Sequence, residues 1–169
     1  MKSGRNEARS RKPISKFVQL RVFQRDRWIC RWCGRPVIFA PTMKYLEQFV
    51  RYHGHIGQLA YYHRNWARGK APLLDHMGAV IDHHEAHSGG GADDEPNLLT
   101  SCNKCNTRKS NTSAVAFSKR SPLLAVKGKY GEPEHWDGLS RLFVLLVEQY
   151  PQNITTDERS WLEALRGSK

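Results

Sequence analysis

The chain has 169 residues, enough for one domain with extensions or at most two very small domains. Its 27 Lys and Arg against 16 Asp and Glu give a formal net charge of +11. A soluble domain this basic usually meets a polyanion, because bound cations release counterions from a phosphate backbone. Charge alone thus favours nucleic acid but also fits a protein that is merely soluble. No apolar run approaches the roughly 20 residues of a membrane span, so no membrane partner is expected.

The first part of the chain, residues 1–13, is polar and basic. It predicts a flexible arm, either an unstructured terminus or a tail that contacts phosphate. Because it lacks the apolar stretch of a secretory signal, we expect an intracellular, cytoplasmic protein. In that compartment four cysteines are expected to hold metal rather than to form disulfides.

Apolar spacing predicts a helix over Lys16–Arg25, capped by Ser15. A tight turn between two cysteines follows, and Val37–Phe39 is expected to be a strand. Residues 43–52 and 56–66 then show helical spacing of apolar and aromatic side chains.

The second half of the chain alternates short apolar and polar stretches. Residues 78–81 and 98–101 predict two short strands, separated by a polar, glycine-rich loop. A second tight turn between cysteines leads into a short basic helix from 103 to about 112. Residues 113–137 predict loop, and 139–149 predict an apolar helix. Thr155 or Thr156 is expected to cap a last helix, with Glu158 in its first turn.

The four cysteines form two C-x2-C pairs, Cys30 with Cys33 and Cys102 with Cys105. Four thiolates suit tetrahedral Zn²⁺ and leave no open position, so the predicted site is structural rather than catalytic. Four unrelated buried thiols are the alternative, which this pairing disfavours. We call each C-x2-C pair a knuckle: Cys30 with Cys33 is the first, and Cys102 with Cys105 is the second. The spacer between them is long, so the fold must bring the two knuckles together.

The stretch IDHHEAHSGGG…DDEPNLLTSCNKCNTRKSN resembles the ββα-metal motif of HNH nucleases, and VFQRDRWICRWCG resembles the entry segment of their zinc-bearing members. The resemblance covers residues 22–36 and 80–111. It implies an α+β fold: a small ββα-metal core stapled by the four-cysteine zinc site, with a helical insertion and C-terminal helices. It also implies an endonuclease that hydrolyses phosphodiesters of DNA, double-stranded for preference, from a bacterial or phage setting.

By this resemblance, His83 is the general base that activates water. Asp82 and the side-chain oxygen of Asn106 would bind a catalytic divalent cation, and Asn97 would orient the base from the loop by bonding backbone near it. Oxygen ligands favour Mg²⁺ or Mn²⁺ over a catalytic Zn²⁺ or Ni²⁺.

The tandem histidines leave a register question. If His83 were the ligand and His84 the base, Asp82 would lie outside the metal's direct contacts. Adjacent strand residues point to opposite faces, so a straight strand would put Asp82 and His84 together. We prefer Asp82 and His83, because Ile81 stands where the family has its apolar residue.

Three further residues are expected to contact nucleic acid. Arg108 and Lys109 follow Asn106 on the predicted helix, where they form either a phosphate clamp or a solvated basic face. His87 is either a loop residue or close to the phosphate. Trp28 and Trp32 flank the first knuckle and are interpreted as packing around the zinc.

Three units are predicted: an arm over 1–13, a nuclease domain over 14–132 with a helical insertion at about 41–77, and a helical extension over 133–169. The extension either docks on the domain or forms a homodimer seam. The insertion either widens the DNA-binding surface, mediates dimerisation or braces a small core. A zinc-stapled binding module without cleavage and an RNA-cleaving nuclease remain the competing functions.

Overall fold

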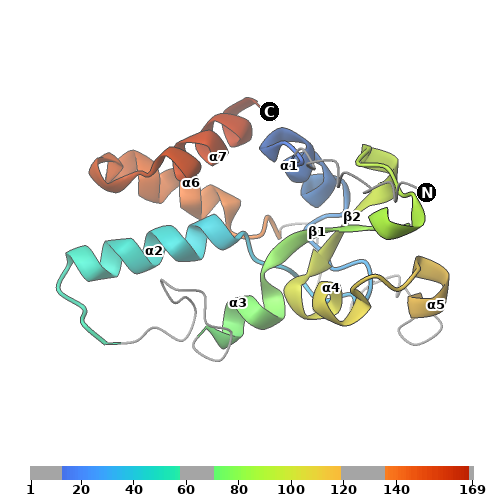
Figure 1. The fold of residues 1–169 in the computed structure, drawn as a ribbon. Coiled ribbons are helices and arrows are strands. Elements are labelled where there is room, and N and C mark those ends of the chain that lie inside the picture. Colours follow the sequence, from blue (N-terminus) through green and yellow to red (C-terminus); the bar gives the residue numbers. More distant parts are fainter. Residues whose placement is uncertain (1–12, 58–70, 119–135, 168–169) are drawn as a thin grey trace, which may run out of the picture.

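The computed structural model describes residues 13–57, 71–118 and 136–167 (Figure 1). Its regular elements in chain order are the helices α1 (Lys16–Arg25), α2 (Ala40–Tyr52) and α3 (Pro72–Met77), the strands β1 (Ala79–His83) and β2 (Leu98–Cys102), and the helices α4 (Asn103–Lys109), α5 (Ala114–Ser118), α6 (Ser140–Gln149) and α7 (Thr156–Gly167). Short 3-10 turns, η2 (His87–Gly89), η3 (Glu95–Asn97) and η5 (Pro151–Asn153), lie between them.

The two strands form an antiparallel hairpin with a long connection. Ala79 lies opposite Cys102 and His83 opposite Leu98. Helix α4 starts directly after β2 and contacts both strands. This ββα unit, surrounded by helices, confirms the predicted α+β fold, and the four cysteines gather beside it.

The segment after the first knuckle is extended but is not a strand, so the expectation for Val37–Phe39 is wrong. Only Ile38 bridges to the start of β1, in parallel with Gly78. The backbone N–H of Phe39 donates instead to the carbonyl of Gly138, and α2 begins at the next residue with a proline in its first turn. Strand pairing beside β1 stops after Ile38 because α2 begins at Ala40.

The C-terminal helices pack on the rest of the chain. Helix α6 lies against α2, and α7 lies against α1 (Figure 1). Phe39 stands where these parts meet: its ring makes edge contacts with Trp28, Phe143 and Trp161 at centroid distances of 5.7, 5.6 and 5.1 Å. Aromatic pairs of this geometry stabilise a fold by more than the burial of their surface area alone. Phe39 therefore helps to hold the C-terminal extension on the core.

Two of the predicted helix caps are present. The Ser15 hydroxyl accepts from the N–H of Val18 at 3.3 Å. At α7, Thr155 rather than Thr156 caps: its hydroxyl accepts from the N–H of Glu158, whose carboxylate accepts from the N–H of Thr155. This reciprocal pair is a capping box.

Other differences from the expectations are local. Helix α3 was not expected, and α5 lies in a stretch predicted as loop. Helix α4 ends at Lys109 rather than near Thr112, because Ser110 takes a positive φ of 48°. The helix predicted over 56–66 and the arm over 1–13 lie almost entirely outside the described residues.

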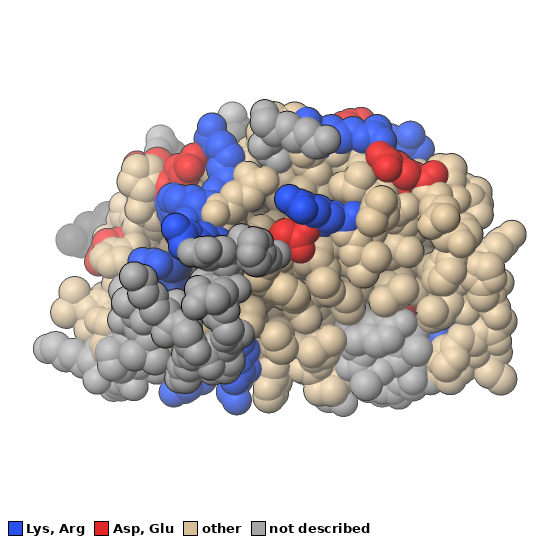
Figure 2. All heavy atoms as spheres, turned by 180° about the vertical axis from the view of Figure 1, so that it is seen from behind, with Lys and Arg blue, Asp and Glu red and all other residues tan. Residues whose placement is uncertain are grey.

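Among the described residues, no helix is both long enough and apolar enough to cross a membrane. Figure 2 shows one face of the molecule, on which Lys and Arg side chains lie at the left, at the centre and at the upper right of the view.

Candidate active site and metal centre

The two C-x2-C pairs meet in one cluster. The four sulfur atoms all lie within 4.8 Å of one another, and the Sγ atoms of Cys33 and Cys102 are 3.9 Å apart. A tetrahedral zinc with bonds of about 2.3 Å separates its sulfurs by about 3.8 Å. The cysteines are thus positioned to hold a metal ion, as the predicted knuckles require.

Each knuckle is a tight backbone turn. In the first, the N–H of Gly34 donates to the carbonyl of Cys30, and Gly34 takes a φ of 72° that a glycine adopts without strain. In the second, Cys102 caps α4 and its sulfur accepts from the N–H of Cys105 at 3.4 Å. The strand end and helix start therefore present two sulfurs on one side.

Crowding shifts the pKa values of the thiols. The hydrogen bond from Cys102, followed by that from Cys105, lowers the pKa of Cys30 from 9.0 to about 7. The same partners lower the pKa of Cys33 far below its usual range, whereas hydrogen bonding with Cys102 raises the pKa of Cys105. The crowded thiols therefore favour ionisation of part of the cluster, and the thiolate is the form of sulfur that binds metal.

A second site lies beside the first, in a cavity of about 570 Å³. Its walls include Asp82, His83, Asn106 and Lys109, together with Ser88 and Asn111. Strand β1 supplies the first pair and α4 the second. Three of the four predicted catalytic residues are thereby brought together, and Asn97 is not part of this wall.

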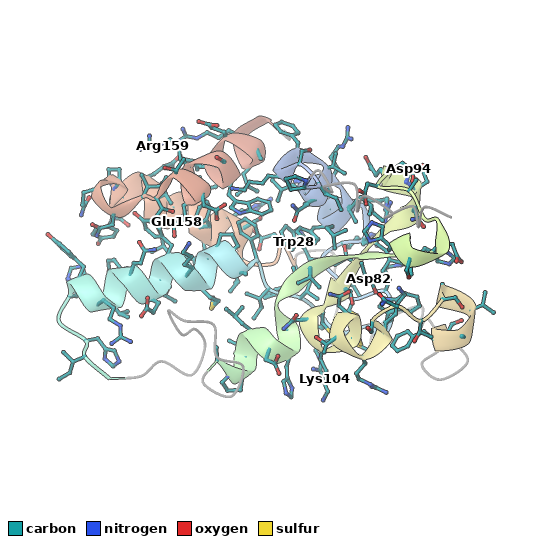
Figure 3. The ribbon with its side chains drawn as sticks, in the orientation of Figure 1. Trp28, Asp82, Asp94, Lys104, Glu158 and Arg159 are labelled. Atoms are coloured by element: carbon teal, nitrogen blue, oxygen red, sulfur yellow. The ribbon has the colours of Figure 1, made fainter. Side chains whose placement is uncertain are left out.

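Asp82 is buried, with 5% of its surface exposed, and its carboxylate accepts three hydrogen bonds. Oδ2 accepts from the indole N–H of Trp32 at 2.7 Å. Oδ1 accepts from the ammonium of Lys109 at 3.2 Å and from the backbone N–H of His83 at 2.8 Å. Figure 3 places Asp82 close to α4. Asp82 is thus oriented by the first knuckle and by α4.

His83, and not His84, faces this cavity. β1 ends at His83, and the N–H of His84 still donates to the carbonyl of Asn97 in the register of the hairpin, but of the two histidines only His83 lines the cavity. The side chain of His84 is 49% exposed, against 13% for His83. His83 therefore lies at the cavity, and its assignment as the base stays a prediction.

Asn97 bonds backbone on both sides of the glycine-rich loop, a position consistent with the expectation for it. Its Oδ1 accepts from the N–H of Glu85 at 2.9 Å, and its Nδ2 donates to the carbonyls of Glu85 and Ala92. Gly91 fits beneath this clamp only because it lacks a side chain: a Cβ there would lie 2.0 Å from the carbonyl oxygen of Glu85.

Of the two interpretations of Lys109, the solvated basic face is wrong, because its side chain is buried in the cavity wall. Lys109 is 1% exposed, and its ammonium lies 5.7 Å from the centroid of the Trp32 ring as well as against Asp82. Arg108 is exposed, but it follows Asn106 by two residues, about 200° around the helix. Arg108 accordingly does not line the cavity, and neither does Lys104, which Figure 3 labels at α4. The side chain of His87 lies outside the described part of the structure.

Two residues near the site were missed. Trp32 was interpreted as packing, yet it bonds Asp82. Asp93 was not singled out, yet its Oδ1 lies 2.7 Å from Nε2 of His83. Neither carries a short-range signal: Trp32 reaches Asp82 across 50 residues, and Asp93 stands within a run of acidic residues.

Residues 70–112 match the model of the HNH endonuclease family. The matched segment contains 43 of the 169 residues and includes α3, the hairpin and α4. The first knuckle lies before it. No curated protein and no solved structure matches the chain. The match agrees with the resemblance of this segment to HNH nucleases and indicates nuclease-type chemistry.

Proposed function

We propose that this protein is a metal-dependent HNH endonuclease that hydrolyses phosphodiester bonds of DNA and prefers double-stranded DNA as its substrate. One observation carries the proposal: Asp82, His83 and Asn106 line a single cavity within the segment that matches the family. A net charge of +11 supports a nucleic-acid partner.

For the cysteine cluster we propose structural Zn²⁺. The donor set fits, because the four sulfurs lie within 4.8 Å of one another and three of the four cysteines are buried within the core. With all four ligands from the protein, no position remains for substrate or water. Its role is to tie the first knuckle to the end of β2.

For the cavity we propose Mg²⁺ or Mn²⁺, held by Asp82 and Asn106. A carboxylate offers about four acceptor positions, and three donors are observed on Asp82, so an oxygen position remains for a hard cation. Asn106 adds an amide oxygen from the same wall. When bound, the cation neutralises charge that develops on the scissile phosphate and its leaving oxygen.

The side chains of the chain perform the other steps. His83 takes the proton of the attacking water, since a neutral imidazole is a suitable base near neutral pH. Trp32 and Lys109 hold the Asp82 carboxylate in one orientation. Asn97 fixes the loop that follows His83 by bonding Glu85 and Ala92.

Two other functions compete with this one. A zinc-stapled binding module would have no need of a base and two oxygen ligands around one cavity. An RNA-cleaving nuclease would use the same chemistry, because in-line attack by water needs no 2′-hydroxyl. Duplex DNA and single-stranded RNA substrates tested in parallel separate the three.

The test is cleavage of supercoiled plasmid with Mg²⁺ or Mn²⁺, with a chelator control. Wild type should nick or cut, and His83→Ala should be slower by about 100-fold or more, because general-base catalysis contributes on the order of 10²- to 10⁴-fold. His84→Ala is the matched control and should cut like wild type. Lack of metal-dependent cutting of either nucleic acid, or a fully active His83→Ala, would refute the proposal.

A further inference from the structure

We infer that Asp93 is a positioning residue, which holds the imidazole of His83 in one tautomer and one orientation. The inference rests on the proposed function, because it concerns the base of that reaction. The observation that carries it is the contact between the two side chains, at 2.7 Å between Nε2 and Oδ1.

The chemistry of this contact fixes the direction of the hydrogen bond. An ionised carboxylate only accepts, so Nε2 of His83 must donate. A neutral imidazole carries one proton, and Nε2–H therefore leaves the lone pair on Nδ1. The ring belongs to a residue that lines the cavity and is only 13% exposed on its side chain. Asp93 thus selects which nitrogen can accept a proton from water.

The loop gives Asp93 a defined place. The carbonyl of Ala92, directly before it, accepts from the Asn97 amide at 2.8 Å, and that amide also donates to the carbonyl of Glu85. The N–H of Asn97 donates to the carbonyl of Asp94 on the other side. Both neighbours of Asp93 are therefore tied to Asn97, and Gly91 permits the close approach that this requires.

Positioning and bulk electrostatics predict opposite effects. An acidic side chain beside the cavity repels a polyanionic substrate, so its removal should strengthen DNA binding if charge were all that mattered. If Asp93 orients His83, its removal slows the chemical step instead. The loop contains a matched residue, Asp94, which is exposed, carries the same charge and has no side-chain contact with His83 among the described interactions. Figure 3 labels it above β1.

The experiment compares Asp93→Ala with Asp94→Ala in the full chain loaded with zinc. Under single-turnover conditions with Mn²⁺, Asp93→Ala should lower the maximal cleavage rate on the order of 10- to 100-fold. A catalytic base that is displaced by about 1 Å can lose up to about 100-fold in rate. Its apparent affinity for DNA should stay equal or rise. Asp94→Ala should cut within about twofold of wild type, as expected for a surface change.

A second measurement does not depend on cleavage. The ¹⁵N resonances of the His83 ring, assigned by comparison with His83→Ala, report the tautomer. Wild type and Asp94→Ala should show protonated Nε2, and Asp93→Ala should show a mixture. An unchanged tautomer in Asp93→Ala, or wild-type cutting by that variant, overturns the inference. A wild type that cuts nothing overturns the proposed function, while the ring spectrum still decides on Asp93.

Discussion

The cysteine cluster and the neighbouring cavity use the same hairpin in opposite ways. Cys102 ends β2 and Asp82 lies on β1, so the two sites are separated by only a few residues of paired strand. Three of the four cysteines of the cluster are buried among core side chains, and the four sulfurs could hold a metal ion. The cavity keeps open space of about 570 Å³ next to a partly bonded carboxylate. On the proposed function, the closed cluster serves the stability of the fold, and the open cavity leaves room for a substrate.

The two sites are nevertheless joined by one side chain. Trp32 stands between Cys30 and Cys33 and donates to Asp82. Its ring also lies under the ammonium of Lys109. A change in the knuckle is therefore expected to move a group of the cavity, whereas loss of a cavity ligand leaves the knuckle in place.

The largest effect is expected from Cys105→Ser, which removes a ligand from the closed site. Structural zinc in small domains contributes on the order of 10 kcal/mol of binding free energy, so the variant should lose zinc and unfold. Metal analysis and circular dichroism check this. His83→Ala, from the open site, should keep about one zinc per chain and its fold. A folded, zinc-loaded Cys105→Ser would show that the two sites do not differ as described.

Lys109→Met comes next, because it removes the charge that faces buried Asp82 while keeping the apolar stem. Breaking a buried ion pair costs roughly 3–5 kcal/mol of unfolding free energy. Mn²⁺ should restore part of this loss, since a divalent cation replaces the missing charge. Lys104→Met, exposed on the same helix, should change stability by no more than about 0.5 kcal/mol. Denaturant unfolding with and without Mn²⁺ gives both values, and equal losses in the two variants would contradict the pairing.

Asn106→Ala affects the open site alone. Loss of an oxygen ligand should slow cleavage on the order of 100-fold and weaken Mn²⁺ binding. The zinc content should not change, because Asn106 is not among the clustered ligands. Single-turnover cleavage and calorimetric Mn²⁺ titration measure the two effects. Unaltered Mn²⁺ affinity would remove Asn106 from the proposed ligand set.

Trp32→Phe tests the link between the sites. The ring packing is kept, but Asp82 loses a hydrogen bond, which should cost about 1–3 kcal/mol of stability and also slow cleavage. Trp136→Phe is a matched control: its indole N–H donates to the carbonyl of Val37 at 2.9 Å. It should lower stability without slowing the chemical step. If both variants cut equally well, Trp32 does not orient Asp82.

The smallest effect is expected far from both sites. Thr155→Ala breaks the capping box of α7 and should cost about 1 kcal/mol. Zinc content and cleavage rate should be those of wild type. Thermal unfolding monitored by circular dichroism measures the loss. A cleavage defect in this variant would show that the C-terminal helices contribute to the open site.

The sequence allowed prediction wherever the signal is short-range. The C-x2-C spacing identified the two knuckles, since each pair defines its own turn, and the structure brings all four sulfurs together. The cap at Ser15, and a cap at Thr155 or Thr156, followed from side chains next to the helices, and the structure has Ser15 and Thr155 as the caps. The match of residues 70–112 agrees with the resemblance of the hairpin and α4 to HNH nucleases.

Prediction failed where a side chain's direction depends on distant packing. Lys109 was interpreted, with Arg108, as part of a phosphate clamp or of a solvated basic face, but α4 turns its side chain inward toward Asp82 and Trp32. The role of Asp93 depends on the path of a loop that backbone hydrogen bonds and a glycine determine. The strand expected at Val37–Phe39 failed because pairing with Gly138 and the start of α2 interrupt the ladder.

Trp32 has an optical consequence. Its indole donates to a carboxylate and lies near an ammonium, and both charged groups change its excited state. We therefore expect Mn²⁺ or Mg²⁺ at Asp82 to alter the emission of this one fluorophore, and zinc removal from the adjacent cysteines to alter it differently. The difference spectrum between wild type and Trp32→Phe would isolate that signal. The protein would thus report the loading of two metal sites through a single native side chain, without an added dye.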